Sequence, residues 1–90
     1  MDEYKDIKLH ILSKMKRRRI WQHKHTSIHN LPKGIPDYLK NSKLIKKVIS
    51  DLLKEKILLS KPTEYGLEIS LNIKKKKEIE SYLEGAENGS

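Results

Sequence analysis

The sequence contains no cysteine and no phenylalanine, and only one tryptophan. Without cysteine the chain can form neither a disulfide bond nor a thiolate metal site, so its stability has to come from packing. No apolar run approaches the roughly 18 residues needed to span a bilayer. The acidic N-terminal segment also lacks the apolar stretch of a signal peptide. We therefore expect a cytoplasmic protein of one small domain without a membrane partner.

Positive charge is the clearest excess in the composition. There are 20 lysines and arginines against 12 acids, which gives a net charge of +8 and an isoelectric point near 9.7. Small basic domains favour polyanionic partners, of which nucleic acid is the first candidate. A source with an AT-rich genome or a hot habitat would also enrich lysine. The positions of the lysines are therefore more informative than their number.

The first helix is predicted from Tyr4 to about Lys16, where apolar residues recur on one face. Acids gather at its start and cations at its end, as the helix dipole favours. The basic run Arg17, Arg18 and Arg19 follows directly. Such a run either contacts phosphate or is simply solvated.

Residues 20–26 have no helical period and leave room for a short strand. A brief helix is expected to begin near Ile28, and it has to end before the prolines and glycine of residues 32–36. One further helical turn follows. In that turn we expect both Tyr38 and Leu39 to point inward.

The chain is organised around the stretch from Asn41 to Leu71. Asn41 or Ser42 can cap a helix that ends near Lys56. The apolar residues of this helix follow an i, i+1, i+4, i+5 pattern and make one broad buried stripe: Leu44, Ile45, Val48, Ile49, Leu52 and Leu53.

A β-hairpin is expected directly after this helix. Its first strand begins at residues 57–59 and is limited by Pro62. Turn residues follow, among which Gly66 can take a positive φ. Residues 67–71 then alternate apolar and polar side chains, as in a half-buried strand.

A last helix is predicted over residues 73–83, with Asn72 as its cap. It begins with four lysines, residues 74–77, which oppose the helix dipole. A bound phosphate would relieve that repulsion, but we favour the interpretation that these lysines are solvated. Its apolar residues either close the core or meet a partner subunit in a homodimer: Ile79, Tyr82 and Leu83. The chain is thus expected to form one domain, residues 1–84, followed by a disordered tail, residues 85–90.

The polar face of the helix after Asn41 carries lysines and no acid. At about 100° per residue, five residues lie opposite the apolar stripe: Lys43, Lys46, Lys47, Ser50 and Lys54. Lysines on such a face can neutralise DNA phosphates. Arg, Asn and Gln, which usually read bases, are absent from it except for Asn41 at its start. The face therefore favours DNA affinity over sequence selectivity, unless it is an ordinary solvated surface.

The order of these elements resembles a winged helix-turn-helix DNA-binding domain, in particular that of small archaeal winged-helix proteins. The likeness covers roughly residues 4–83 and is carried by the run ISDLLKEKILLSKPT and by the alternating hairpin after it. It implies an α+β, mainly α-helical fold with a three-helix core, a two-stranded wing hairpin and a C-terminal helix. It also implies that the third helix is the recognition helix.

Two features depart from the winged-helix pattern. The junction Glu55-Lys56-Ile57 has no glycine, which such domains usually carry where the recognition helix meets the wing. The segment from Gly34 to Leu53 is also longer than the usual turn and recognition helix. The N-terminal end of the recognition helix is therefore left open.

The predicted wing offers less to a phosphate backbone than the helix does. Lys61 is favourable, whereas Glu64 would repel a phosphate. Tyr65 could contact a sugar or stack on a base, or it could pack on the hairpin.

Metal binding and catalysis have little support in the sequence. The four histidines have no cysteine or nearby acid to complete a four-ligand set, so no metal and no cofactor are expected. No nucleophile, base and orienting residue occur together, so an enzyme is not expected.

These patterns together predict a protein that binds double-stranded DNA, as a transcriptional regulator or an element-associated factor. Two other functions remain open. Winged-helix domains also serve as protein-interaction modules, for which an apolar patch at Tyr38, Leu39, Tyr82 and Leu83 would be the partner surface. An RNA-binding variant of the same domain is the other.

Overall fold

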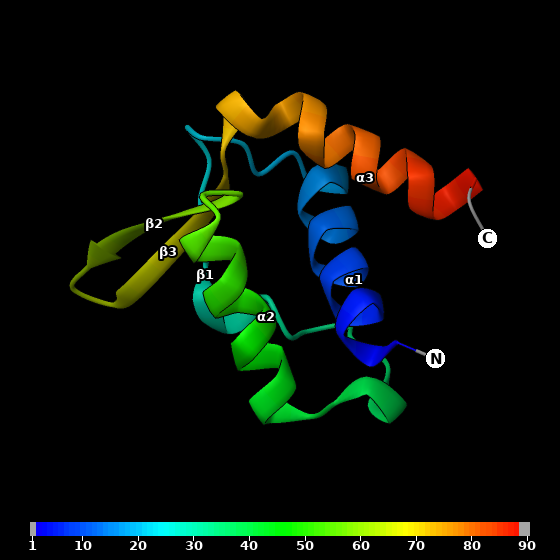
Figure 1. The fold of residues 1–90 in the computed structure, drawn as a ribbon. Coiled ribbons are helices and arrows are strands. Elements are labelled where there is room, and N and C mark those ends of the chain that lie inside the picture. The colour runs from blue at the N-terminus through cyan, green and yellow to red at the C-terminus, as the bar shows by residue number, and fades with distance from the viewer. Residues whose placement is uncertain (1, 89–90) are drawn as a thin grey trace.

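Three α-helices and a three-stranded antiparallel sheet make up residues 2–88, the part of the chain that the computed structural model describes (Figure 1). The helices are α1 (Glu3–Arg17), α2 (Ser42–Lys54) and α3 (Lys76–Asn88). The strands are β1 (Thr26–Ser27), β2 (Leu58–Thr63) and β3 (Gly66–Leu71). Three 3₁₀ turns link them: η1 (Ile28–Asn30), η2 (Asp37–Leu39) and η3 (Ile73–Lys75). The expected α+β, mainly helical fold class is confirmed.

The sheet has the order β1-β3-β2, so β3 lies in the middle. β2 and β3 form the predicted hairpin, in which Gly66 takes a φ of +115°. The third strand comes from Thr26 and Ser27, which pair with Ile69 and Glu68 of β3. In Figure 1 the hairpin projects away from the three helices. By the strand order β2 is an edge strand, where a proline is tolerated. The strand continues through Pro62 to Thr63, so the expectation that Pro62 limits it is wrong.

A single core of isoleucine and leucine lies between the helices and the sheet. The predicted stripe of α2 supplies four of its buried residues: Ile45, Val48, Ile49 and Leu52. The apolar face of α3 packs on α1, with Ile79 and Leu83 buried. The face that could have met a partner subunit therefore closes the core instead.

The junction between α2 and β2 explains the missing glycine. Lys56 takes a left-handed conformation with φ +61°, which is the conformation that a glycine usually supplies at the end of a helix. The amide of Lys56 donates to the carbonyl of Leu53, and that of Ile57 donates to the carbonyl of Leu52. These two bonds form a Schellman motif, and α1 ends in the same way at Arg19, which has φ +56°.

Replacing Lys56 by glycine should therefore stabilise the protein. A non-glycine residue in the left-handed region costs the folded state roughly 1–2 kcal/mol of strain, which glycine avoids. Glycine offsets part of this gain, because it has more conformational freedom to lose on folding. We expect the Lys56→Gly variant to unfold with a free energy about 1 kcal/mol higher in urea titrations. The matched control is Lys54→Gly, inside the last helical turn, whose free energy of unfolding should fall by about 1 kcal/mol. If both variants lost the same free energy of unfolding, the backbone of Lys56 would not be strained.

The segment between α1 and α2 differs from the expected three-helix core. It contains no α-helix, only the turns η1 and η2, because the prolines at positions 32 and 36 leave no room for i→i+4 bonding. Leu39 is buried as expected, but the inward orientation expected for Tyr38 is wrong, because this side chain is 75% exposed.

The C-terminal helix is longer than the sequence indicated. We expected it to end near Leu83, whereas α3 continues to Asn88. Its start is as predicted, because the side chain of Asn72 accepts a hydrogen bond from the amide of Lys74. Of the expected disordered tail, residues 89 and 90 lie outside the described part of the chain.

Candidate nucleic-acid interface

The exposed face of α2 carries the lysines that the helical period placed there. The side chain of Asn41 caps the helix, accepting a hydrogen bond from the amide of Leu44 at 3.2 Å. The cap sets the start of the helix, and the burial of Val48 and Leu52 sets the side that faces the core. The remaining face is exposed, and it consists of the five predicted residues: Lys43, Lys46, Lys47, Ser50 and Lys54.

One of these lysines has an acidic partner. The amino group of Lys47 lies 3.5 Å from Asp51, whose carboxylate also accepts a 2.6 Å hydrogen bond from the hydroxyl of Tyr4 on α1. The bond from Tyr4, followed by the charge of Lys47, holds the pKa of Asp51 below its ordinary value. The same bond raises the pKa of Tyr4 to about 12. Three lysines of this face form no salt bridge with any residue in the described range: Lys43, Lys46 and Lys54.

Asn41 has a structural use that competes with reading DNA. Its side-chain oxygen accepts the cap hydrogen bond, which holds the side chain against the start of the helix and leaves one lone pair of that oxygen unused. A bidentate contact to adenine needs both groups of the asparagine. The cap therefore restricts the orientation of the one base-reading side chain that the sequence offered for this face.

The hairpin adds little positive charge to this face. Lys61 is exposed on β2, but it lies directly across from Glu68 on β3. Tyr65 is 87% exposed at the tip, so the alternative that it packs on the hairpin is wrong. With Glu64 also exposed, the projecting hairpin carries one cation and two acids.

Arg17, the last residue of α1, points away from the side of that helix that faces α2. Tyr4 faces α2, as its bond to Asp51 shows. Arg17 follows Tyr4 by 13 positions in the sequence, which places it roughly 140° further round the same helix. Arg17, Arg18 and Arg19 are all exposed, and none of them lines the cavity that Lys46 and Lys54 of α2 border.

Arg17 and Arg18 belong to a second basic group with Lys14 and Lys33, which the sequence did not reveal. The amino group of Lys14 donates to the backbone carbonyls of Asn30 and Lys33, at 2.8 and 2.7 Å. Burial lowers the pKa of Lys14, and the charges of Arg18, Lys33 and Arg17 lower it further. This group forms only in the fold, because the loop that supplies Lys33 has no helical period that could place it.

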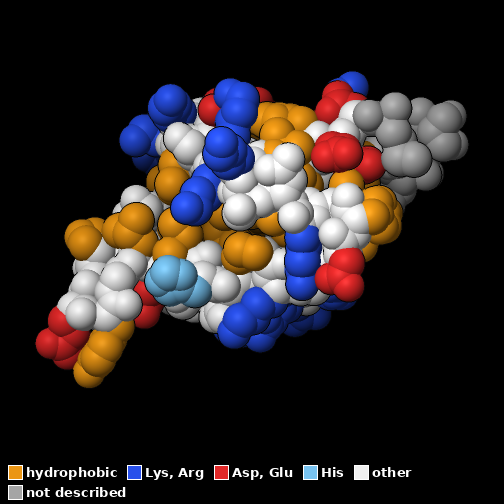
Figure 2. Space-filling model, turned by 90° about the horizontal axis from the view of Figure 1, so that it is seen from below, with side chains coloured by type: hydrophobic (Ala, Val, Ile, Leu, Met, Phe, Trp, Pro, Cys, Tyr) orange, Lys and Arg blue, Asp and Glu red, His pale blue; other side chains and the backbone are white. Residues whose placement is uncertain are grey.

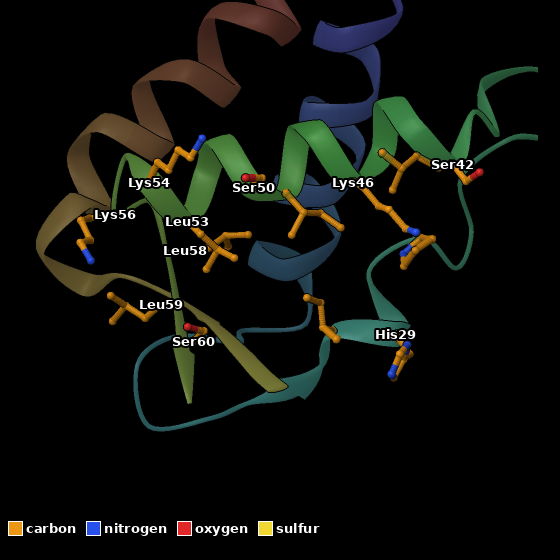
Figure 3. A pocket seen from close by; sticks show the side chains of 14 residues that line it. His29, Ser42, Lys46, Ser50, Leu53, Lys54, Lys56, Leu58, Leu59 and Ser60 are labelled. Atoms are coloured by element: carbon orange, nitrogen blue, oxygen red, sulfur yellow. The ribbon is translucent and has the colours of Figure 1, made fainter. Parts of the chain in front are cut away.

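An open cavity of about 810 Å³ runs beside α2, between that helix, η1 and β2 (Figure 3). Three residues of the predicted face also border it, Lys46, Ser50 and Lys54. Its other lining residues are mainly apolar: Ile28, His29, Pro32, Ser42, Ile45, Ile49, Leu53, Lys56, Leu58, Leu59 and Ser60. In Figure 2 hydrophobic side chains are open to the surface among Lys and Arg side chains.

The sequence contains one signal for this cavity, in the width of the apolar stripe of α2. The apolar stripe of α2 spans about 180° from Leu44 to Leu53, which is wider than the roughly 100° that faces the core in a surface helix. Leu53 lies at its margin and is only partly buried. An excess width of this kind predicts an apolar groove as well as a core.

Residues 2–88 show neither a metal-binding cluster nor a membrane-spanning helix. Within residues 2–88, no three His, Cys, Asp or Glu side chains are grouped so as to hold a metal ion. Over the same range, no helix combines the length and apolar character needed to cross a membrane. Comparisons with protein-family models, with curated proteins and with solved structures find no significant match to this chain.

Proposed function

We propose that this protein is a winged-helix-like domain that binds double-stranded DNA through α2. The observation that carries the proposal is the exposed face of α2, on which Lys43, Lys46 and Lys54 form no salt bridge with a described residue. A helix of this width fits the major groove, and lysines along it neutralise phosphates. The protein acts as a transcriptional regulator or as an element-associated DNA-binding factor.

The arrangement of the elements supports the winged-helix part of the proposal. α2 is followed directly by the hairpin of β2 and β3, which projects beside it as a wing would (Figure 1). Lys56 takes the left-handed conformation that glycine provides at this junction in winged-helix domains. The first helix of the helix-turn-helix is replaced by the turns η1 and η2, which is the main departure.

The chemistry of the face predicts binding with little sequence preference. Lysine contacts a phosphate as a point charge, and the exposed face of α2 presents lysine and serine but no arginine or glutamine. The side-chain oxygen of Asn41 is engaged by the helix cap. Affinity should therefore come from the backbone of the duplex and depend strongly on salt.

The test is the affinity for a labelled random-sequence duplex at several salt concentrations. Three phosphate contacts give a slope of log K against log salt of about −2.7. The affinity should then fall roughly 40-fold between 50 and 200 mM salt. Absence of binding at 50 mM salt, or an affinity that does not change with salt, would rule the proposal out. Duplexes of different sequence serve as the control and should bind within a few-fold of one another.

A further inference from the structure

The cavity beside α2 leaves apolar side chains without cover. Ile45 and Ile49 of α2 form its floor together with Leu58 of β2. Leu53 and Leu59 line its open side and are only partly buried. Figure 3 shows Leu53, Leu58 and Leu59 at the end of the cavity that is nearest the hairpin. Partly exposed leucines on an open groove favour an apolar occupant.

Positive charge surrounds this groove. Lys46 and Lys56 lie towards its opposite ends, and its lining contains no aspartate or glutamate among residues 2–88 (Figure 3). Lys54 also belongs to the lining, but its amino group extends away from the cavity in this view. Lys46 lies within α2, whereas Lys56 lies two residues beyond the end of the helix at Lys54. An elongated apolar occupant with carboxylates on both sides therefore fits the groove.

The tip of the hairpin has this complementary character. Tyr65 is 87% and Leu67 is 38% exposed, so two large apolar side chains face solvent there. Glu64 and Glu68 flank them in the sequence. In a chain of net charge +8, residues 63–68 contain two acids and no cation, and the cation of the hairpin, Lys61 on β2, lies across from Glu68. Figure 2 shows acidic and hydrophobic side chains together on the projecting hairpin.

The tip is also held in one conformation. The hydroxyl of Thr63 accepts a hydrogen bond from the amide of Tyr65 at 3.2 Å and donates to the carbonyl of Gly66 at 2.8 Å. A segment that is already ordered loses little conformational entropy when it docks. The hairpin tip is thus a preorganised acidic and apolar ligand.

A hairpin tip cannot reach the groove of its own chain. The groove lies at the start of β2, around Leu58, while the tip follows the last residue of this six-residue strand. Six residues of strand span roughly 20 Å. A two-fold axis between two copies brings a tip to a groove. It places the β2 edge strands of the two copies antiparallel, so that the hairpin tip of each copy lies at the start of β2 in the other copy. We infer that two copies of this chain associate in this way, with residues 63–68 of each copy in the groove beside α2 of the other.

Sedimentation velocity tests the inference directly, and it does not depend on whether the protein binds DNA. The wild-type chain should shift from monomer to dimer between about 5 and 500 µM, the range of a modest homodimer. The double variant Tyr65→Ser/Leu67→Ser should raise the dissociation constant at least about tenfold, because both anchoring side chains are lost. The matched control is Tyr38→Ser, which removes another exposed tyrosine and should change nothing.

The groove supplies the second half of the test. The double variant Leu53→Gln/Leu59→Gln should also weaken the dimer at least about tenfold. Lys46→Glu/Lys56→Glu offers the same test without touching the core, because both lysines are exposed. An equimolar mixture of the tip variant and the leucine variant should form a heterodimer with one intact contact, at an affinity above that of either variant alone.

Two results would overturn the inference. One is a wild-type chain that stays monomeric throughout the concentration series. The other is a dimer whose dissociation constant is the same in the wild type, the tip variant and the groove variants. In the second case the contact lies elsewhere on the chain. Circular dichroism of each variant, matched to the wild type, shows that a lost dimer does not reflect a lost fold.

Discussion

Duplex DNA should bind at least about a hundredfold more weakly when Lys43, Lys46 and Lys54 are all replaced by glutamate. Each lysine is exposed on one face of α2, and none has a salt-bridge partner among residues 2–88. The change removes three cations that would neutralise phosphates and places three carboxylates against the duplex. The slope of log K against log salt should become shallower by about 2.7. Fluorescence anisotropy with a labelled duplex measures both quantities.

The control for this experiment keeps the total charge equal. Replacing Lys74, Lys76 and Lys77 by glutamate also removes six positive units and lowers the net charge from +8 to +2. Lys74 is exposed in η3 and Lys76 and Lys77 are exposed in the first turn of α3, where carboxylates improve the interaction with the helix dipole. The control variant should therefore remain folded and lose only the general attraction of the net charge. Equal losses in the two variants would show that α2 is not the contact face.

The largest effect on stability is expected from Leu52→Ala. Leu52 has no exposed surface, and it lies at the centre of the apolar stripe of α2. Removing a fully buried leucine side chain costs about 2–5 kcal/mol, from lost transfer energy and from the cavity left behind. The total free energy of unfolding of a domain is roughly 5–15 kcal/mol, so the variant should be close to unfolding at 37 °C. Urea unfolding followed by circular dichroism measures the loss.

Leu53→Ala is the matched control for this change. It alters the same residue type at the next position of the helix, but this side chain borders the open cavity and is only partly buried. The free energy of unfolding of Leu53→Ala should fall by roughly 1 kcal/mol, because water already reaches the site and little new cavity forms. If the two variants lost the same stability, the division of the apolar stripe into core and groove would be wrong.

The local pattern of α2 was predictable because each residue's position around a helix follows from its number in the chain. The apolar period placed Val48 and Leu52 in the core and Lys43 and Lys46 on the exposed face. The cap at Asn41 followed from its side chain, which accepts from the amide of Leu44. The function of that face stays a prediction, since exposed charge alone does not name a partner.

Features that depend on long-range contact were not predictable in this way. β1 is too short to show a period of two, and Thr26 pairs with Ile69, more than 40 residues away in the chain. Tyr38 is next to a buried leucine in the sequence, yet it points to solvent. Neither outcome is contained in the spacing of neighbouring residues.

The sequence by itself determined the presence of the three α-helices, the hairpin, the net charge and the side of α2 on which the lysines lie. These follow from local periodicity, from turn residues such as Gly66 and from composition. Only the tertiary structure decided that Arg17 faces away from α2, that Lys56 takes the place of a glycine, and that an apolar groove opens beside the lysine face. The reason is physical, because burial, cavity shape and pairing of distant strands are set by how elements pack on one another.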